Sequence, residues 1–423
     1  MRKLLLSAMI VLGLIIPQQS SATKINILKS KDKKVFQKRT HFLENYFSKP
    51  GKPELNKRNG NKLLVLLIEF DDTELFEDNP QTTGNGKFQI DPTDYPITLG
   101  KPPHDRDFFL MQLEALKHYY RAASLYSNDG FNEYGFNLEY DIFPQPEVPG
   151  VFQAYTLPHE MAYYSPAGAS YELMISRFEE YFQDCFTIAD GDEDIDFSQF
   201  GHFMLIHAGS DWQHDIFGDT PSDMPSFFIK IGEGKEVIVD QGIIIDNSCN
   251  IPETITQDIQ INNGGDPASV EGYGLINAVM AHEFGHSMGF VDLYNTRNNY
   301  PAVGYYDIMD SGGMGGLTLP FDENGEINYD DYQYFYDIEG GLPILPGVWS
   351  RLIAWEEDFR DRGILKDFSE LNFDEIIEIN PAEKKIIPNE NIPYFVKLQF
   401  NDHEYILIEN RQIDPDGDGG TAV

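Results

Sequence analysis

The chain has 423 residues, and its 31 lysines and arginines face 69 aspartates and glutamates, a formal net charge of −38. So few cations cannot form the basic face that nucleic-acid binding by counterion release requires, and we expect no nucleic-acid partner. With 41% hydrophobic and 13% aromatic residues the chain can bury a large core, which excludes wholesale disorder.

The N-terminus has the three-part pattern of a secretory signal peptide. A charged start precedes an apolar run over residues 4–16, and small residues follow up to Ala22. The run is short for a membrane span, so we predict a signal peptide over residues 1–22 and a secreted protein; an uncleaved N-terminal anchor is the alternative. No later stretch is long and apolar enough to predict a membrane span in the mature form.

Residues 23–60 form a basic, polar stretch without sustained helical or strand periodicity. We interpret it as a pro-segment or flexible leader. The dibasic pairs at Lys38 with Arg39 and Lys57 with Arg58 are candidate processing sites, and solvated surface is the alternative reading of both.

The folded body begins with the continuous apolar run KLLVLLIEF, residues 62–70, which predicts a strand buried on both faces. Residues 72–105 are rich in Pro, Gly, Thr, Asn and Asp, and they predict a long surface loop.

Strand and helix patterns then alternate along the chain. Apolar residues recur at helical spacing over residues 107–124 and 171–186, and residues 201–209 and 235–246 are strand-like. This alternation predicts an α/β or α+β body of stacked layers, which we place at residues 61–365.

The sequence pattern changes to short strand-like segments beyond about residue 370. Strand-like pieces at 375–379, 393–400 and 403–410 predict a β-rich C-terminal section over residues 366–423. The two cysteines, Cys185 and Cys249, are free to pair in an exported protein, and two unpaired buried thiols fit almost equally well.

The chemistry is concentrated in YGLINAVMAHEFGHSMGFVDLY, residues 273–294, whose apolar residues recur as in a largely buried helix. His282 and His286 stand one turn apart on this helix and project the same way. Two imidazoles at this spacing can bind one Zn²⁺, while the neighbouring Glu283 reaches a water molecule on the metal. The alternative is a core helix whose histidines bond to the backbone.

A turn after the helix offers a third ligand. Gly289 tolerates the positive φ of a sharp helix end, and Asp292 follows three residues later with an oxygen ligand. A metal on three protein ligands keeps a position for water, and Glu283 is then the expected general base for hydrolysis of a peptide bond.

HEFGHSMGFVDLY resembles the extended zinc motif of the immune inhibitor A family of secreted bacterial metalloproteases, HExxHxxGxxD followed shortly by Tyr. Further resembling segments are LLVLLIEFDD, IHAGSDWQHD, YILIENRQ, and the tyrosine pairs Tyr119, Tyr120 and Tyr163, Tyr164. The resemblance implies a zincin-like catalytic domain with zinc on His282, His286 and Asp292 and with Glu283 catalytic.

A methionine turn lies beneath the metal in related zincins, and YDIMDSGG makes Met309 the candidate here; plain packing is the alternative. The acidic, tyrosine-rich residues 320–347 depart from the family pattern as an insertion that forms an exposed loop or a lid. The resemblance also implies further strands beyond DPDGDGGTAV, so we expect a truncated or fragmentary chain with an incomplete C-terminal section.

Two further roles have candidates without motif support. A group that stabilises the oxyanion is expected, from the set Tyr294, Tyr305, Tyr306, His207 and His214. Acids alternate at Asp190, Asp192 and Asp194, and again at Asp414, Asp416 and Asp418, as at the start of a Ca²⁺ loop. Neither run has the closing Glu of an EF-hand, and solvated acidic surface is the alternative.

These patterns together predict a secreted zinc endopeptidase, made as a precursor, that acts on proteins or peptides. One alternative is a secreted calcium-dependent binding or adhesion protein with a structural zinc helix; another is a zinc hydrolase of non-protein amides. The intact His282, Glu283 and His286 favour an enzyme. The oligomeric state is left open.

Overall fold

The computed structural model describes residues 60–72, 81–92, 100–215, 218–232, 234–240, 242–263, 266–295, 298, 300–314, 317–322, 328, 330–332, 334–338, 340–371, 378–383, 392–401 and 404–412. The predicted signal peptide, nearly all of the leader and the aspartates from Asp414 onward lie outside these residues.

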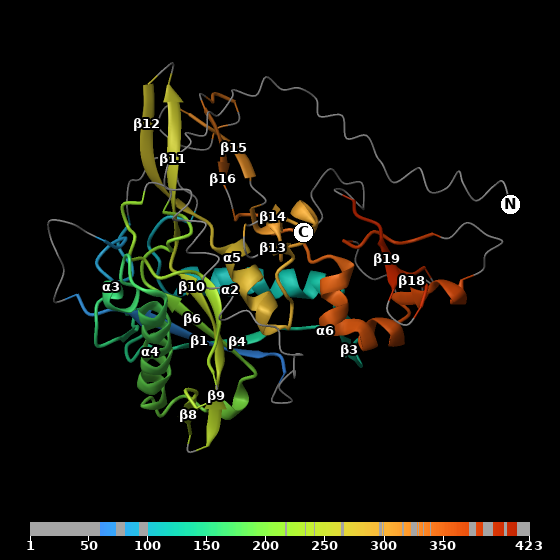
Figure 1. Cartoon of the computed structure of the whole chain (residues 1–423), viewed down its shortest axis with the longest axis horizontal. Helices are drawn as coiled ribbons and strands as arrows, with labels where there is room; N and C mark the ends of the chain where they lie inside the picture. The colour runs from blue at the N-terminus through green and yellow to red at the C-terminus, as the bar shows by residue number, and fades with distance from the viewer. Residues whose placement is uncertain are drawn as a thin grey trace.

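The centre of the molecule is a sheet with the strand order β4-β1-β6-β10-β7 (Figure 1). Its strands are β1 Lys62–Glu69, β4 Glu139–Phe143, β6 His202–His207, β10 Asn247–Pro252 and β7 Phe227–Lys230. β1, β4, β6 and β10 run parallel, while β7 pairs antiparallel with β10 at the edge. The short β5, Tyr155–Thr156, also pairs with β1.

Successive side chains of β1 enter two different cores, because side chains alternate between the faces of a strand. Leu63 and Val65 pack on one face in a core with residues of α2 (Arg106–Ala123) and α5 (Asn277–Ser287). Leu64 and Leu66 pack on the other face in a core with residues of α4 (Tyr171–Asp190). The prediction of a strand buried on both faces is therefore confirmed.

Helices cover both faces of this sheet (Figure 1). They are α2 Arg106–Ala123, α3 Met161–Tyr164, α4 Tyr171–Asp190, α5 Asn277–Ser287 and α6 Val348–Asp361. Asp105 caps α2 by accepting from the Phe108 amide, and Ser170 caps α4 by accepting from the Leu173 amide. α4 runs four residues beyond the predicted end because its buried stripe continues through Ala189.

The strand predicted over residues 235–246 is wrong in detail. The segment folds back as a hairpin of β8 Val237–Val239 and β9 Ile243–Ile245, with Asp240 at a positive φ of 45° in the turn. The strand that joins the central sheet is the next one, β10, which its polar sequence NSCNIP conceals. Its buried Asn250 accepts from the Tyr181 hydroxyl and donates to the Pro225 carbonyl, so the polar side chain is satisfied.

Short hairpins and turns make up the periphery. The paired strands are β2 Ser127–Asn128 with β3 Glu133–Tyr134, β11 Ile255–Asn263 with β12 Asp266–Gly274, β13 Tyr294–Asn295 with β14 Tyr300–Pro301, and β15 Leu317–Phe321 with β16 Tyr334–Ile338. The 3-10 turns are η1 Phe197–Gln199, η2 Gly304–Tyr306, η3 Ser311–Met314 and η4 Phe368–Glu370. β12 reaches Gly274, so the helix expected from residue 273 begins only at Asn277. In the insertion predicted over residues 320–347, the described part includes β16.

A second sheet forms a β-rich C-terminal section beside α6 (Figure 1). Its strands are β17 Leu365–Asp367, β18 Phe395–Gln399 and β19 Tyr405–Glu409. β17 pairs parallel with β18, and β18 pairs antiparallel with β19. The predicted domain limits stay a prediction; the one between residues 365 and 366 falls inside β17. Most of the strand predicted at 375–379 lies outside the described residues.

The two cysteines belong to opposite faces of the central sheet. Cys249 packs in the core with α2 and α5, and Cys185 in the core with α4; both are buried free thiols. The unpaired alternative is the correct one. A membrane span is likewise not found: no helix in the described part of the chain has the length and apolar character to cross a bilayer.

Candidate metal centre

Three predicted ligands converge at the end of α5. His282 and His286 lie one turn apart, with ring centroids 5.1 Å apart and planes at 82°. The chain leaves the helix through Gly289, at φ 92°, and returns Asp292 to the two rings. Asp292 Oδ1 lies 3.2 Å from His282 Nε2 and 3.3 Å from His286 Nε2. One ligand atom from each residue falls within 4.8 Å of the others.

Both rings are oriented by backbone carbonyls. Nδ1 of His282 lies 2.9 Å from the Ile308 carbonyl oxygen, and Nδ1 of His286 lies 3.0 Å from that of Phe290. A carbonyl oxygen only accepts, so the proton must be on Nδ1 in both rings. In the neutral imidazole this leaves the lone pair on Nε2, the atom that faces Asp292 and could ligate a metal.

The donor set fits a zinc-type cation. Two imidazole nitrogens and one carboxylate oxygen are usual ligands of zinc in catalytic sites. Asp292 Oδ1 is buried without a hydrogen bond of acceptable geometry, although it points at both histidines. A cation between these three atoms would satisfy all of them.

The charges of the site reinforce this reading. Burial alone lowers the pKa of an imidazole, but the adjacent carboxylates of Asp292 and Glu283 raise the pKa of His282 to about 10. Burial alone raises the pKa of a carboxyl, yet the two histidines hold the pKa of Asp292 well below its usual range. The pocket is therefore built to hold positive charge.

Glu283 follows the first histidine on the same helix and is only 8% exposed. Burial raises the pKa of Glu283, and the nearby imidazoles oppose this only in part. A carboxylate with a raised pKa is a stronger base, which suits a group that must accept a proton near neutral pH.

Met309 lies buried against the turn of α5 that carries the histidines. A Cβ placed on Gly285 would come within 2.9 Å of the Met309 sulfur. The Met309 carbonyl accepts from the Leu293 amide at 2.8 Å, and Leu293 is the neighbour of Asp292. Met309 therefore packs against the turn of α5 between the two histidines, and its role as a methionine turn stays a prediction.

Asp307 holds this turn, and sequence reasoning did not single it out. It is 2% exposed, and its Oδ1 accepts from the Met309 amide at 2.9 Å. Its Oδ2 accepts from the Gly347 amide at 2.8 Å and from the Ser350 hydroxyl at 2.7 Å, at the start of α6. The only signal in the sequence was an acid two residues before the methionine.

The tyrosine pair of α2 braces the same region from the core. The Tyr120 hydroxyl donates to the Ala281 carbonyl at 2.6 Å, directly before His282. The Tyr119 hydroxyl donates to the Ile344 carbonyl at 2.8 Å. These two hydrogen bonds connect α2 to α5 and to the segment that leads into α6.

The five oxyanion candidates lie in different settings. Tyr305 and Tyr306 are exposed in a 3-10 turn, and Tyr294 is half-buried in β13. His207 is fully buried, which lowers its pKa to about 4. His214 is half-buried, with Nδ1 2.5 Å from Asp211 Oδ1. The structure does not single out one of them for the role.

The three aspartates of the first calcium candidate are engaged in local bonds. Asp190 Oδ1 accepts from the Asp240 amide, and Asp192 accepts from the Asp194 amide and from the Tyr155 hydroxyl. Among the described residues, they do not form a group of converging ligand atoms like the one at His282. Calcium at this cluster stays a prediction.

A sheet sandwiched by helices, with a two-histidine helix and a returning carboxylate, defines a metallopeptidase with a zincin-like α/β catalytic domain. Residues 253–342 match the family model of the immune inhibitor A peptidase M6 catalytic domain, a family of peptide hydrolases, and this match supports the resemblance of the histidine motif to that family. The matched segment contains α5, Asp292 and Met309. Neither the curated proteins nor the solved structures gave a match to the chain.

Proposed function

We propose that the protein is a secreted zinc-dependent endopeptidase that cleaves proteins or peptides. The proposal is carried by one observation: two Nε2 atoms, each left bare by an Nδ1–H bond to a carbonyl, converge on Asp292 beside Glu283. The signal-peptide pattern of residues 1–22 supports export, and the basic residues 23–60 support synthesis as a precursor. Calcium at the aspartates near Asp192 belongs to the proposal only as an accessory ion.

In this proposal His282, His286 and Asp292 hold the metal. Zinc in such a site supplies Lewis acidity, which polarises a peptide carbonyl and makes a water molecule acidic enough to lose a proton near neutral pH. Glu283 accepts that proton and returns it to the leaving amine. The carbonyls of Ile308 and Phe290 keep both imidazoles in the ligating tautomer throughout.

The test separates metal binding from proton transfer. The secreted form of the wild type is expected to contain about one zinc per chain and to digest casein. Glu283→Gln keeps the size of the side chain and leaves all three ligands in place, so metal content is retained while kcat falls by about 10²- to 10⁴-fold. Glu356→Gln, which changes a part-exposed glutamate paired with Arg360, is the matched control and keeps full activity.

Two results would contradict the proposal. Full activity in Glu283→Gln would remove the general base from the mechanism. A wild type that binds zinc but cleaves no protein would favour the binding protein or the hydrolase of non-protein amides.

A further inference from the structure

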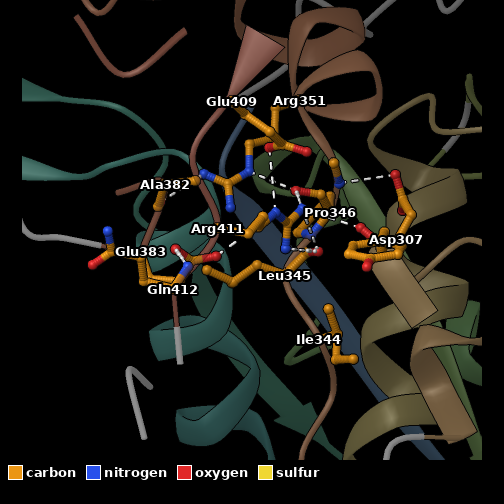
Figure 2. A network of polar contacts seen from close by, with 12 residues as sticks. Asp307, Ile344, Leu345, Pro346, Arg351, Ala382, Glu383, Glu409, Arg411 and Gln412 are labelled. Carbon is orange, nitrogen blue, oxygen red and sulfur yellow. Dashed lines mark hydrogen bonds and ion pairs between the residues drawn. The ribbon is translucent and has the colours of Figure 1, made fainter. Parts of the chain in front are cut away.

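Arg411 follows β19 and reaches back to the segment that leads into α6 (Figure 2). Its Nη1 donates to the Leu345 carbonyl at 3.1 Å, and its Nη2 donates to the same oxygen at 3.2 Å. Nη2 also donates to the Pro346 carbonyl at 2.9 Å and to the Tyr306 carbonyl at 3.1 Å. One guanidinium therefore joins two segments that are 40 residues apart in the chain, at Tyr306 and Pro346.

Two acids lie at ion-pair distance from the guanidinium, without a hydrogen bond of acceptable geometry to its Nε. Nε of Arg411 lies 3.3 Å from Glu409 Oε2 and 3.7 Å from Glu383 Oε1. The fully buried Arg351 supports the same place from α6, because its Nε donates to the Pro346 carbonyl at 2.7 Å. Figure 2 shows both arginines pointing toward the Pro346 backbone.

The two segments that Arg411 joins are the two segments that Asp307 bridges. Tyr306 directly precedes Asp307, and Pro346 directly precedes Gly347, whose amide donates to Asp307. Asp307 in turn fixes the Met309 amide, and the Ile308 carbonyl between them orients Nδ1 of His282. Hydrogen bonds and the peptide bonds between neighbouring residues thus connect Arg411, just beyond β19, with a predicted metal ligand.

We propose that Arg411 is a positioning residue for the metal centre: it fixes the backbone around Asp307 and, through the Ile308 carbonyl, the orientation of His282. This inference rests on the proposed metal site. The bonds that orient a metal-ligating histidine usually change metal affinity by about 10- to 100-fold when they are disturbed. Arg411 acts one step behind such a bond, on the segment that supplies its acceptor.

The geometry requires arginine. Four contacts to three carbonyl oxygens use both terminal nitrogens of a planar fork, while Nε remains for the acids. A lysine ammonium is a compact charge that cannot span these positions. Arg411→Lys therefore keeps the charge beside Glu409 and Glu383 and removes the clamp.

The experiment compares Arg411→Lys and Arg411→Ala with Arg362→Ala in the full chain. Arg362 donates to the Leu125 and Ser124 carbonyls at 2.7 Å and 2.9 Å, so its loss removes a similar clamp at the other end of α6. Each variant is titrated with Co²⁺ against a chelator, and the visible spectrum and the melting temperature are recorded. Co²⁺ serves as the probe because its spectrum reports ligand geometry.

Both Arg411 variants are expected to bind Co²⁺ about 10-fold more weakly or worse, with a changed spectrum. Arg362→Ala is expected to melt at a lower temperature with Co²⁺ affinity within about twofold of the wild type. If Arg411→Ala does not fold, Arg411→Lys decides the question alone.

The failures of the two proposals are distinguishable. A wild type that binds no Co²⁺, or a His282→Ala variant that binds it unchanged, would refute the metal site itself. A wild type that binds Co²⁺ and loses it in His282→Ala, beside an Arg411→Lys with unchanged affinity and spectrum, would refute the role of Arg411. An Arg411→Lys that loses no more affinity than Arg362→Ala at an equal drop in melting temperature would refute it as well.

Discussion

The Met309 sulfur packs against Gly285, the helix residue that precedes His286, so closely that a Cβ there would lie 2.9 Å away. The same Cβ would meet Phe290 Cδ2 at 3.0 Å and the Tyr120 hydroxyl at 3.2 Å. Three elements therefore close on one helical position that has no side chain. This contact sets how near the methionine turn comes to the metal ligands.

Gly285→Ala is expected to destabilise the protein by about 1–3 kcal/mol, because overpacking at this contact outweighs the better helix propensity of alanine, which is about 1 kcal/mol. Urea unfolding measures the loss, and metal content measures its effect on the site. Gly313→Ala is the control, since its Cβ would sit at an ordinary 3.7 Å from Ile308 Cδ1. A Gly285→Ala variant as stable as the wild type would show that the Met309 turn can move to make room for the added methyl group.

Asp307→Asn should cost about 3 kcal/mol or more, since three donors lose a buried carboxylate and hydrogen bonds to charged groups contribute about 1.5–3 kcal/mol each. The amide NH₂ also faces donors on one side. Thermal unfolding and metal content are the readouts. Asp129→Asn, at an exposed turn aspartate, is the control and should change stability by less than about 1 kcal/mol. Unchanged stability in Asp307→Asn would contradict the claim that the Asp307 carboxylate holds the Met309 turn to the start of α6.

Acid should destabilise the fold through two buried histidines of β6. Burial lowers the pKa of His202 and of His207 to about 4, from an ordinary value of 6.5. Below pH 6.5 the unfolded chain binds protons that the folded chain does not, so stability falls as the pH drops toward 4. The loss is about 3 kcal/mol for each histidine over the whole window.

The measurement is urea unfolding at several pH values between 7.5 and 4. His202→Gln can still accept from the Ser287 hydroxyl. Its free energy of unfolding should fall less steeply with decreasing pH, because one proton fewer is taken up on unfolding. Other groups titrate in both proteins and cancel in the comparison. Parallel pH profiles would show that His202 is not buried as a neutral ring.

Chelation should abolish proteolysis without unfolding the protein. The three ligand side chains are not members of either core around β1, although α5 itself contributes Met280 and Phe284 to one of them. Helix content by circular dichroism should therefore persist, and the melting temperature should fall, because a ligand at 1,000 times its Kd stabilises by about 4 kcal/mol. Zinc should restore activity. Complete unfolding on chelation would show that the metal organises the fold.

The sequence predicted the elements whose signals are local. The apolar run of β1, the periodic stripes of α2 and α4, and the histidine spacing of α5 each lie within one segment. β10 was not predicted because its polar residues look unlike a buried strand, and the hydrogen bonds that allow their burial come from residues distant in sequence, such as Tyr181. The hairpin of β8 and β9 depends on a turn with positive φ at Asp240, and Gly242 in the same turn is the local signal that the prediction of one continuous strand overlooked.

The candidate site follows the same division. His282, Glu283, His286 and Asp292 lie within eleven residues, so their spacing alone places them together. Asp307 and Arg411 act through backbone groups up to 105 residues away, as in the bond from Arg411 to Tyr306. Such contacts depend on how the layers dock, and a single sequence does not contain that information in readable form.

The way β1 enters the sheet limits where a leader can be trimmed. The Gly60 carbonyl accepts a hydrogen bond from the His202 ring, and the Asn61 carbonyl accepts from the Glu139 amide. The Lys62 carbonyl accepts from the Gly201 amide. A cut after Arg58 would spare all of these bonds, whereas one inside residues 62–69 would sever β1, an inner strand of the central sheet. Under the proposed maturation from a precursor, the cut must fall before Gly60, and the dibasic pair Lys57 and Arg58 satisfies this limit.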